Sequence, residues 1–180
     1  MSKRDTRDVA VAFLARGADE NWAESVTRFA KSYSLHGAGI DHTLYLIAKG
    51  FSSDSKLQEA LDMFRGHNVK LVLVGDDNLD IGAYIAAAPS ISESTVCFLN
   101  TNSELLCGGW LLKLLRNFMR EDVGLVGATG SFESNEHDPR FPPMPNIHVR
   151  TNGFVIDRAL FLEMSRSTLI GSKTDAHLFE

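Results

Sequence analysis

Cysteine, proline and long apolar runs are all scarce in this sequence. Only two of its 180 residues are cysteine, Cys97 and Cys107, which is too few for a disulfide framework or a four-ligand zinc site. We therefore expect reduced thiols in a cytoplasmic chain. No run of about 18 apolar residues occurs, so a transmembrane helix is not expected. Residues 1–8 are mostly polar or charged and do not resemble a signal peptide.

Positive charge is also in deficit. The chain has 18 Lys and Arg against 23 Asp and Glu, which gives a formal charge of −5. This balance argues against a general affinity for nucleic acid or for an anionic membrane, because both attract a positive surface. With 44% hydrophobic and 23% charged residues the composition is globular, and 180 residues suit one domain spanning 1–180.

Short apolar runs alternate with segments of helical periodicity. This alternation predicts an α/β fold, a single Rossmann-like domain with a mostly parallel central sheet and helices on both faces. Strands are predicted over residues 9–14, 43–48, 69–74, 95–99 and 123–126. Helices are predicted to start near Asn21, near Ser55 with Gln58 at capping-box spacing, and at Asp80 as an N-cap, and a fourth carries Trp110.

The pattern changes after Gly130. Residues 131–146 hold four of the five prolines, which is typical of a functional or a disordered loop. A strand is then predicted over residues 147–156, followed by a helix capped by Asp157. The chain stops after Glu180 without an obvious terminal element, so we expect that its C-terminal part is missing.

Polar residues follow each of the first four predicted strands. These strand ends read Arg16-Gly17, Lys49-Gly50, Gly75-Asp76-Asp77 and Asn100-Thr101-Asn102. Ligands of open parallel sheets bind beyond the carboxyl ends of the strands, so one hypothesis is a binding site at this edge. The alternative hypothesis is that these residues are polar only because each strand is leaving the core.

Several nucleotide and hydrolase motifs are missing. Residues 15–19 lack the three spaced glycines of a dinucleotide fingerprint, and neither a P-loop lysine motif nor Gly-x-Ser-x-Gly occurs. The glycines of segment 124–130 lie in and just after a strand, which favours close packing over phosphate binding.

Two histidine-containing segments are further candidates. His137 lies in the Pro-rich segment and is expected to be solvated. His148, Arg150 and Asn152 would share one face of the late predicted strand, because side chains alternate along a strand. We interpret that face as one wall of a cleft, and the alternative is an ordinary edge strand.

Five segments in a fixed order carry a family resemblance. They are residues 80–88, 96–103, 109–111, 123–128 and 150–158. Their order resembles the GT-A fold of family 2 glycosyltransferases, the nucleotide-diphospho-sugar transferases, especially bacterial members of polysaccharide biosynthesis. The resemblance covers nearly the whole chain. It implies transfer of a hexosyl or deoxyhexosyl group from a nucleotide-sugar donor to a glycan or lipid-linked acceptor.

The resemblance also implies roles for individual residues. The residues that would contact the nucleotide sugar are Arg16, Lys49, Asp76, Asp77, Asp80, Asn100 and Asn102. The acceptor side would hold His148, Arg150 and Asn152. Inverting members use a late carboxylate as general base on the acceptor hydroxyl, for which Asp175 and Glu180 are the candidates.

The chain departs from this family at the metal motif. Family members usually have Asp-x-Asp where this chain has Asn100-Thr101-Asn102. Paired carboxylates bind Mg²⁺ or Mn²⁺, which neutralises the leaving diphosphate, whereas an amide oxygen is a much weaker ligand. The chain could keep activity in two ways. In the first, which we rank ahead, the side chains of Arg16, Lys49 and Arg150 neutralise the diphosphate without a metal ion. In the second, the acidic residues after the third strand, Asp76, Asp77 and Asp80, hold a metal ion.

Two other functions stay open. One is a non-catalytic sugar-nucleotide or carbohydrate-binding module that kept the fold and lost the metal motif. The other is a nucleotidyltransferase, which is disfavoured because no Gly-rich, Lys-containing loop follows the first strand.

Overall fold

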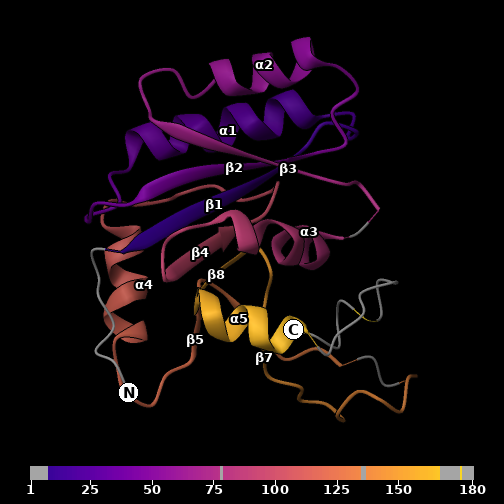
Figure 1. The fold of residues 1–180 in the computed structure, drawn as a ribbon. Coiled ribbons are helices and arrows are strands. Elements are labelled where there is room, and N and C mark those ends of the chain that lie inside the picture. Colours follow the sequence, from indigo (N-terminus) through magenta and orange to yellow (C-terminus); the bar gives the residue numbers. More distant parts are fainter. Residues whose placement is uncertain (1–7, 78, 135–136, 167–174, 176–180) are drawn as a thin grey trace.

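A six-stranded sheet forms the centre of the protein (Figure 1). The computed structural model describes residues 8–77, 79–134, 137–166 and 175. The strand order is β3-β2-β1-β4-β8-β5. These strands are β1 (Val9–Arg16), β2 (Thr43–Lys49), β3 (Val69–Val74), β4 (Thr95–Leu99), β5 (Leu125–Gly127) and β8 (Gly153–Asp157). β1 to β4 run parallel and β8 is antiparallel to its neighbours, so the predicted α/β class with a mostly parallel sheet is confirmed.

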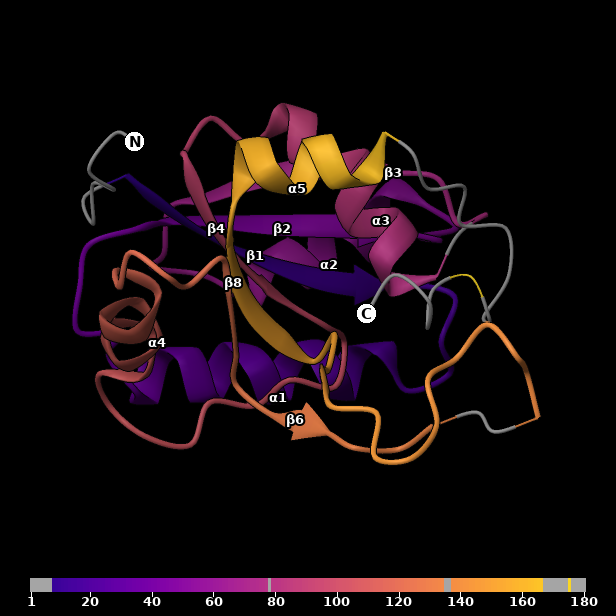
Figure 2. The same cartoon turned by 90° about the horizontal axis from the view of Figure 1, so that it is seen from below.

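Helices cover both faces of the sheet. They are α1 (Trp22–Leu35), α2 (Asp54–Asp62), α3 (Asp80–Ala87), the 3₁₀ helix η1 (Ala88–Ser90), α4 (Trp110–Phe118) and α5 (Arg158–Ser165). α1, α2 and α4 pack on one face, and α3, η1 and α5 pack on the other (Figure 2). Within the described residues, each helix is too short or too polar to cross a bilayer.

β1 contributes to both halves of the core because alternate residues of a strand point to opposite faces. Val11 and Phe13 face α1, and Ala10 and Ala12 belong to the cluster around α3. Phe13 stacks on Phe29 of α1, with 3.8 Å between the ring centroids and 4° between the ring planes. All of these side chains are fully buried, which is why the strand reads as a continuous apolar run.

β3 is less buried than its apolar run predicted. It is the edge strand of the sheet, and Leu71 and Leu73 are 38% and 65% exposed. An edge strand has a neighbour on one side only, so the same apolar sequence that is buried in β1 stays partly open to solvent here.

α2 and α3 begin at or next to the predicted positions, but their predicted caps are wrong. The N-cap of α2 is Ser53, whose hydroxyl accepts a hydrogen bond from the Lys56 backbone N–H at 3.3 Å, and not Ser55. Asp80 is the first residue of α3 rather than its N-cap, so its carboxyl group is available for other contacts. The predicted cap of α5 is confirmed, because Asp157 accepts from the backbone N–H of Leu160 at 2.9 Å.

The strand predicted over residues 147–156 is two strands. A second, small sheet joins β6 (Gly130–Ser131) to β7 (His148–Val149), while β8 pairs with β4 and β5. The chain turns between β7 and β8 because the two strands hydrogen-bond to different partners. His148, Arg150 and Asn152 therefore do not share one strand face, and that prediction is wrong.

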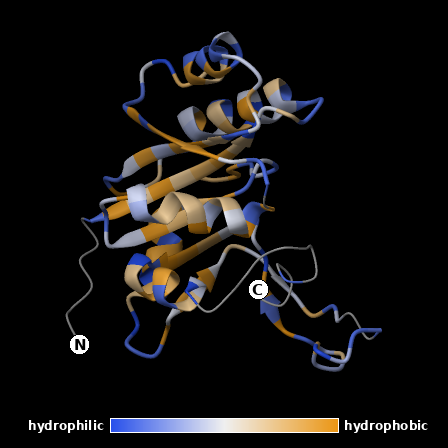
Figure 3. Cartoon of the chain, turned by 45° about the vertical axis from the view of Figure 1, so that its right-hand side comes forward, coloured by the Kyte–Doolittle hydropathy of each residue, from blue (hydrophilic) through white to orange (hydrophobic). Residues whose placement is uncertain are grey.

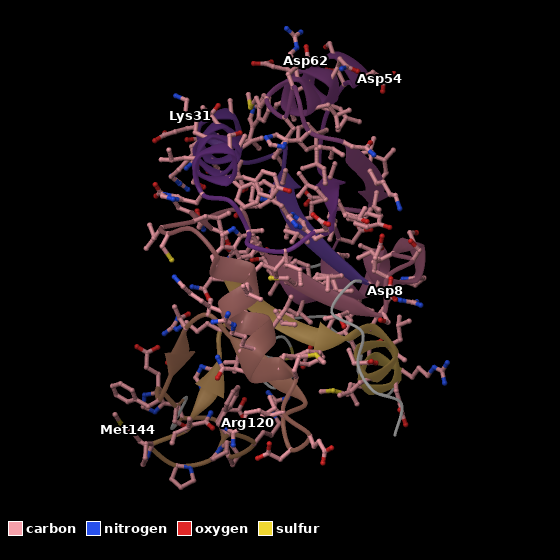
Figure 4. The ribbon with its side chains drawn as sticks, turned by 90° about the vertical axis from the view of Figure 1, so that its left-hand side faces the viewer. Asp8, Lys31, Asp54, Asp62, Arg120 and Met144 are labelled. Atoms are coloured by element: carbon pink, nitrogen blue, oxygen red, sulfur yellow. The ribbon has the colours of Figure 1, made fainter. Side chains whose placement is uncertain are left out.

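The described residues between β6 and β7, 132–134 and 137–147, project from the body of the protein, and we call them the arm (Figure 3). Met144 of the arm lies at one end of the molecule, and Asp54 and Asp62 of α2 lie at the other (Figure 4). Phe132 and Met144 are 60% and 56% exposed. The arm thus adds little to the core.

Replacement of Phe13 by Ala tests how far the core depends on the aromatic stack. We expect a loss of about 3–5 kcal/mol in the free energy of unfolding, because a buried ring is removed and leaves a cavity. Urea denaturation followed by circular dichroism measures this. Phe132→Ala is the control, since that ring is exposed on the arm, and it should leave the urea midpoint unchanged. Equal losses in the two variants would contradict the packing described here.

Candidate functional site

The carboxyl ends of β1 to β4 meet at one edge of the sheet. Arg16 and Lys49, the last residues of β1 and β2, are direct register partners, and Lys49 is paired with Val74 at the end of β3. On the other side of β1, Leu99 at the end of β4 faces Gly153, where β8 begins. Most of the polar residues predicted for the nucleotide sugar therefore lie along a single edge.

Arg16 and Asp76 form the central contact of this edge. Arg16 Nε donates to Asp76 Oδ1 at 2.7 Å and Nη2 donates to Oδ2 at 2.8 Å, a two-point ion pair. The third nitrogen, Nη1, donates to Asp19 Oδ1 at 2.7 Å. The hydrogen bonds to Asp76 raise the pKa of Arg16, and the same bonds lower the pKa of Asp76 below its ordinary value.

Lys49 lies beneath this pair. Its side chain is only 3% exposed, and Nζ is 3.8 Å from Asp76 Oδ1. A buried ammonium is costly unless an anion lies beside it, so Asp76 compensates two cations at once. The backbone supports the arrangement, since the Gly17 N–H donates to the Lys49 carbonyl oxygen at 2.9 Å.

Gly50 allows the chain to leave β2 next to Asp76. Its φ is +64°, in the left-handed region that favours glycine. A Cβ atom at this position would lie 2.9 Å from Asp76 Oδ2. The Lys49-Gly50 pair seen in the sequence thus has a structural reason, because a side chain at position 50 would push Asp76 away from Arg16.

Asp80 and Asn100 form the next part of the edge. Burial raises the pKa of Asp80 above its ordinary 3.8, and the charge of Lys49 and a hydrogen bond from Asn100 act in the opposite direction. The side-chain oxygen of Asn100 accepts from the Asn102 N–H at 3.1 Å and lies 3.2 Å from the Ser103 hydroxyl. The side-chain oxygen of Asn100 is therefore engaged within the Asn-x-Asn turn.

Ser103 connects this turn to the start of β8. Its hydroxyl lies 2.5 Å from the carbonyl oxygen of Asn152. The side chain of Asn152 accepts from Thr129 Oγ1 at 2.8 Å. Asn152, predicted for the acceptor side, thus lies beside the predicted donor residues rather than apart from them.

The remaining predicted residues are placed elsewhere. Arg150 donates to Glu133 Oε2 at 2.7 Å at the base of the arm, and His148 Nδ1 lies 2.8 Å from the carbonyl oxygen of Asn146. Asp175 Oδ1 lies 3.9 Å from Nη1 of Arg140, a residue of the arm. Asp77 and Asn102 are exposed at the main edge. Glu180 lies outside the described residues.

The described residues do not fit a divalent metal ion. Within them, no three His, Cys, Asp or Glu side chains are grouped so that they could hold one. Asp76 is engaged by Arg16 and Lys49, and the oxygen of Asn100 is engaged by its own turn. The two cations Arg16 and Lys49 both approach the carboxylate of Asp76.

Two residues of the edge were missed by the sequence analysis. Asp19 belongs to the loop after β1, and its spacing of three from Arg16 was a usable signal. Lys56 is the third cation near the edge: its Nζ donates to the Gly17 carbonyl oxygen and lies 5.1 Å from the centre of the Trp22 ring. No sequence signal indicated Lys56, since it reaches the edge from α2.

Comparison with solved structures identifies the fold. The protein superposes on 4-diphosphocytidyl-2C-methyl-D-erythritol synthase from Anaerococcus prevotii with a TM-score of 0.62 and 11% identity, covering 96% of this chain and 81% of that one. Glucosyl-3-phosphoglycerate synthase from Mycobacterium tuberculosis with bound UDP superposes with a TM-score of 0.58 and 17% identity. The match covers 96% of this chain and 64% of that one. The galactosyltransferase LgtC with donor and acceptor sugar analogues superposes with a TM-score of 0.59 and 14% identity. The match covers 86% of this chain and 59% of that one.

The protein has the GT-A-like fold of nucleotide-diphospho-sugar transferases. At 11–17% identity the likeness establishes the fold alone. No family model and no curated protein sequence matches the chain. In this fold, strand order and strand direction bring the carboxyl ends of β1 to β4 together with the start of β8, which is where the polar edge lies.

The Arg16–Asp76 pair predicts a pH-dependent stability. We expect Asp76→Asn to lower the free energy of unfolding at pH 7 by about 1–3 kcal/mol, because its charged hydrogen bonds with Arg16 and its attraction to the Lys49 ammonium are lost. The pKa of Asp76 is lowered in the folded protein, so its contribution is present above its ordinary pKa of 3.8 and declines as the pH falls below it.

Urea denaturation of both proteins between pH 3 and pH 7 measures this difference. Asp138→Asn is the control, because Asp138 also contacts an arginine at two points but its partner Arg140 is an exposed near neighbour on the arm, where an ion pair contributes little. The control should match the parent at pH 7. A difference for Asp76→Asn that stays constant down to pH 3 would contradict the prediction.

Proposed function

We propose that the protein is a glycosyltransferase that transfers a sugar from a nucleotide-diphosphate donor without a metal ion. The single observation that carries the proposal is the convergence of Arg16 and Lys49 at the carboxyl edge of a GT-A-like sheet. Ligands of open α/β sheets bind at this edge. Two solved structures of the same fold contain UDP or sugar analogues of donor and acceptor, which agrees with such a donor.

The proposed role of the cations is to neutralise the diphosphate leaving group. The planar guanidinium of Arg16 now holds a carboxylate at two points, and the same geometry suits two phosphate oxygens. A bound diphosphate would compete with Asp76 for Arg16, while Lys49 would supply a second positive charge from below. Fixed cations would stabilise the negative charge that develops on the leaving diphosphate, as a metal ion does in other sites.

The proposed acceptor side lies between the main edge and the arm. The acceptor hydroxyl oxygen would attack the anomeric carbon, the bond from that carbon to the diphosphate would break, and a carboxylate would take the hydroxyl proton. We propose Asp175 as this base, with Glu180 as the second candidate. Arg140 Nη1 of the arm lies 3.9 Å from Asp175 Oδ1, which supports a position of the proposed base beside the arm.

Isothermal titration calorimetry with UDP-, GDP-, dTDP- and CDP-sugars, in EDTA and in Mn²⁺, tests donor binding. We expect one donor class to bind with the same Kd in both buffers. Arg16→Gln should weaken that binding by about tenfold or more, because hydrogen bonds to a charged group are lost. Arg140→Gln is the control and should keep the Kd. Absence of heat with every donor, or binding that requires Mn²⁺, would contradict the proposal.

A non-catalytic sugar-nucleotide or carbohydrate-binding module is the second candidate. This candidate is favoured because Asp76 and Asp19 already neutralise the charge of Arg16 within the protein. Turnover separates the two functions. Release of nucleoside diphosphate that falls about 10²-fold or more in Asp175→Asn supports the enzyme. Donor binding without turnover supports the module.

A further inference from the structure

The outer edge of β3 has no neighbouring strand. Within the described residues β3 pairs only with β2, in one-to-one parallel register from Val69 to Val74. Along a strand, the N–H and C=O groups point alternately to the two sides, so half of those of β3 point away from the sheet. These groups form a row of hydrogen-bond donors and acceptors that a further strand would satisfy. The edge of β3 therefore has the backbone chemistry to bind an extended chain.

β3 also lacks the features that usually protect an edge strand. Proline, a bulge or a charged side chain at the edge commonly prevents pairing with another chain. Residues 69–74 contain neither proline nor a bulge, and Lys70 is their only charged residue. Its Nζ donates to the Tyr45 hydroxyl at 3.2 Å and lies 3.6 Å from Glu93 Oε1, so contacts within the protein hold this lysine on the α3 face. The edge is thus unprotected.

Two leucines of β3 add apolar surface beside this edge. Leu71 and Leu73 are 38% and 65% exposed. Val72 between them belongs to the core cluster on the α3 face, so both leucines point to the face of α1 and α2. Burial of their exposed surface would stabilise a complex. A strand that fits this edge therefore carries apolar side chains on the same face.

A second copy of β3 has this pattern. Two β3 strands can pair antiparallel around a two-fold axis at Val72, because such an axis matches the edge with itself. In this register Leu71 of one copy lies directly opposite Leu73 of the other, with Cβ atoms about 5 Å apart. The four leucines then form one apolar patch that spans both copies.

The charges near β3 favour the same orientation. Lys70 lies near the amino end of β3 with its side chain 50% exposed, and the exposed Asp77 follows the carboxyl end. Antiparallel pairing brings the amino end of one strand to the carboxyl end of the other. Lys70 and Asp77 of different copies would then be about three residues, roughly 10 Å, apart along the strands, within the range of charge attraction at about 0.1 M salt. Parallel pairing would instead place like charges side by side.

We propose that the protein forms a homodimer in which two β3 strands pair antiparallel and join the two sheets into one. This inference goes beyond the proposed function and does not depend on it. A strand of about 20 Å with its two leucines offers less area than the total of about 1,200 Å² that stable interfaces bury. We therefore expect a weak dimer, with a Kd of about 10–100 μM.

Sedimentation velocity of the whole chain between about 1 and 300 μM tests this association. We expect the mean mass to rise from that of a 19.8 kDa monomer toward twice that value. A monomer at every concentration would overturn the proposal and leave the edge to a strand from another protein.

Variants locate the interface. Leu73→Lys should raise the Kd about tenfold or more, because a charge replaces a leucine within the apolar patch. Leu35→Lys is the matched control, since Leu35 is 76% exposed on α1 and not on β3, and it should associate as the parent does. If Leu73→Lys does not fold, Leu73→Thr, expected to raise the Kd severalfold, replaces it. Equal association of the Leu73 and Leu35 variants would also overturn the proposal.

Cysteine cross-linking tests the register. In a Cys107→Ser background, which removes the exposed thiol and keeps the buried Cys97, Leu71→Cys protein is mixed with Leu73→Cys protein and oxidised. We expect a disulfide-linked dimer in the mixture and about fivefold less in either variant alone, because position 71 faces position 73 in the proposed register. Equal cross-linking in all three samples would contradict antiparallel pairing at Val72.

Discussion

The ion pair between Arg16 and Asp76 is the contact on which the functional edge depends. It joins the end of β1 to the loop after β3, two positions 60 residues apart in the sequence. The β2 strand runs between them, and its last residue, Lys49, is buried beneath the pair. One carboxylate therefore compensates two cations, and the glycine after Lys49 is needed because any side chain there would meet that carboxylate.

This arrangement changes how a GT-A-like protein could handle a diphosphate. In a site built on paired carboxylates, the metal ion is the charge that meets the phosphates. Here the carboxylate oxygens are turned toward the protein's own cations, and the Asn-x-Asn turn uses its side-chain oxygen internally. In the proposed function, the fixed cations Arg16 and Lys49 would take the place of an exchangeable metal ion.

Much of this could be predicted from the sequence. The alternation of apolar runs and helical segments was sufficient for the fold, since strands such as β1 are buried on both faces and keep a clear pattern. The strand-end residues Arg16, Lys49 and Asp76 were found for the same reason, because parallel strands end at one edge. The exposure of Leu73 could not be predicted, because strand order is a property of the whole sheet and not of the β3 segment.

Long-range contacts account for the other misses. The break between β7 and β8 depends on partners at least 17 residues away, so the local sequence pattern predicted a single strand. Lys56 reaches the edge from a helix face with no local signal. The side-chain oxygen of Asn100 is held by the Asn102 N–H and the Ser103 hydroxyl, and a motif alone cannot show such contacts.

A crystal structure with a nucleoside-diphosphate sugar bound in the presence of EDTA tests the central claim most directly. The account predicts diphosphate oxygens within hydrogen-bonding distance of the Arg16 guanidinium and near Lys49, with the Asp76 carboxylate displaced from at least one of its contacts with Arg16. A diphosphate bound away from both cations, with the Arg16–Asp76 pair intact, would contradict it.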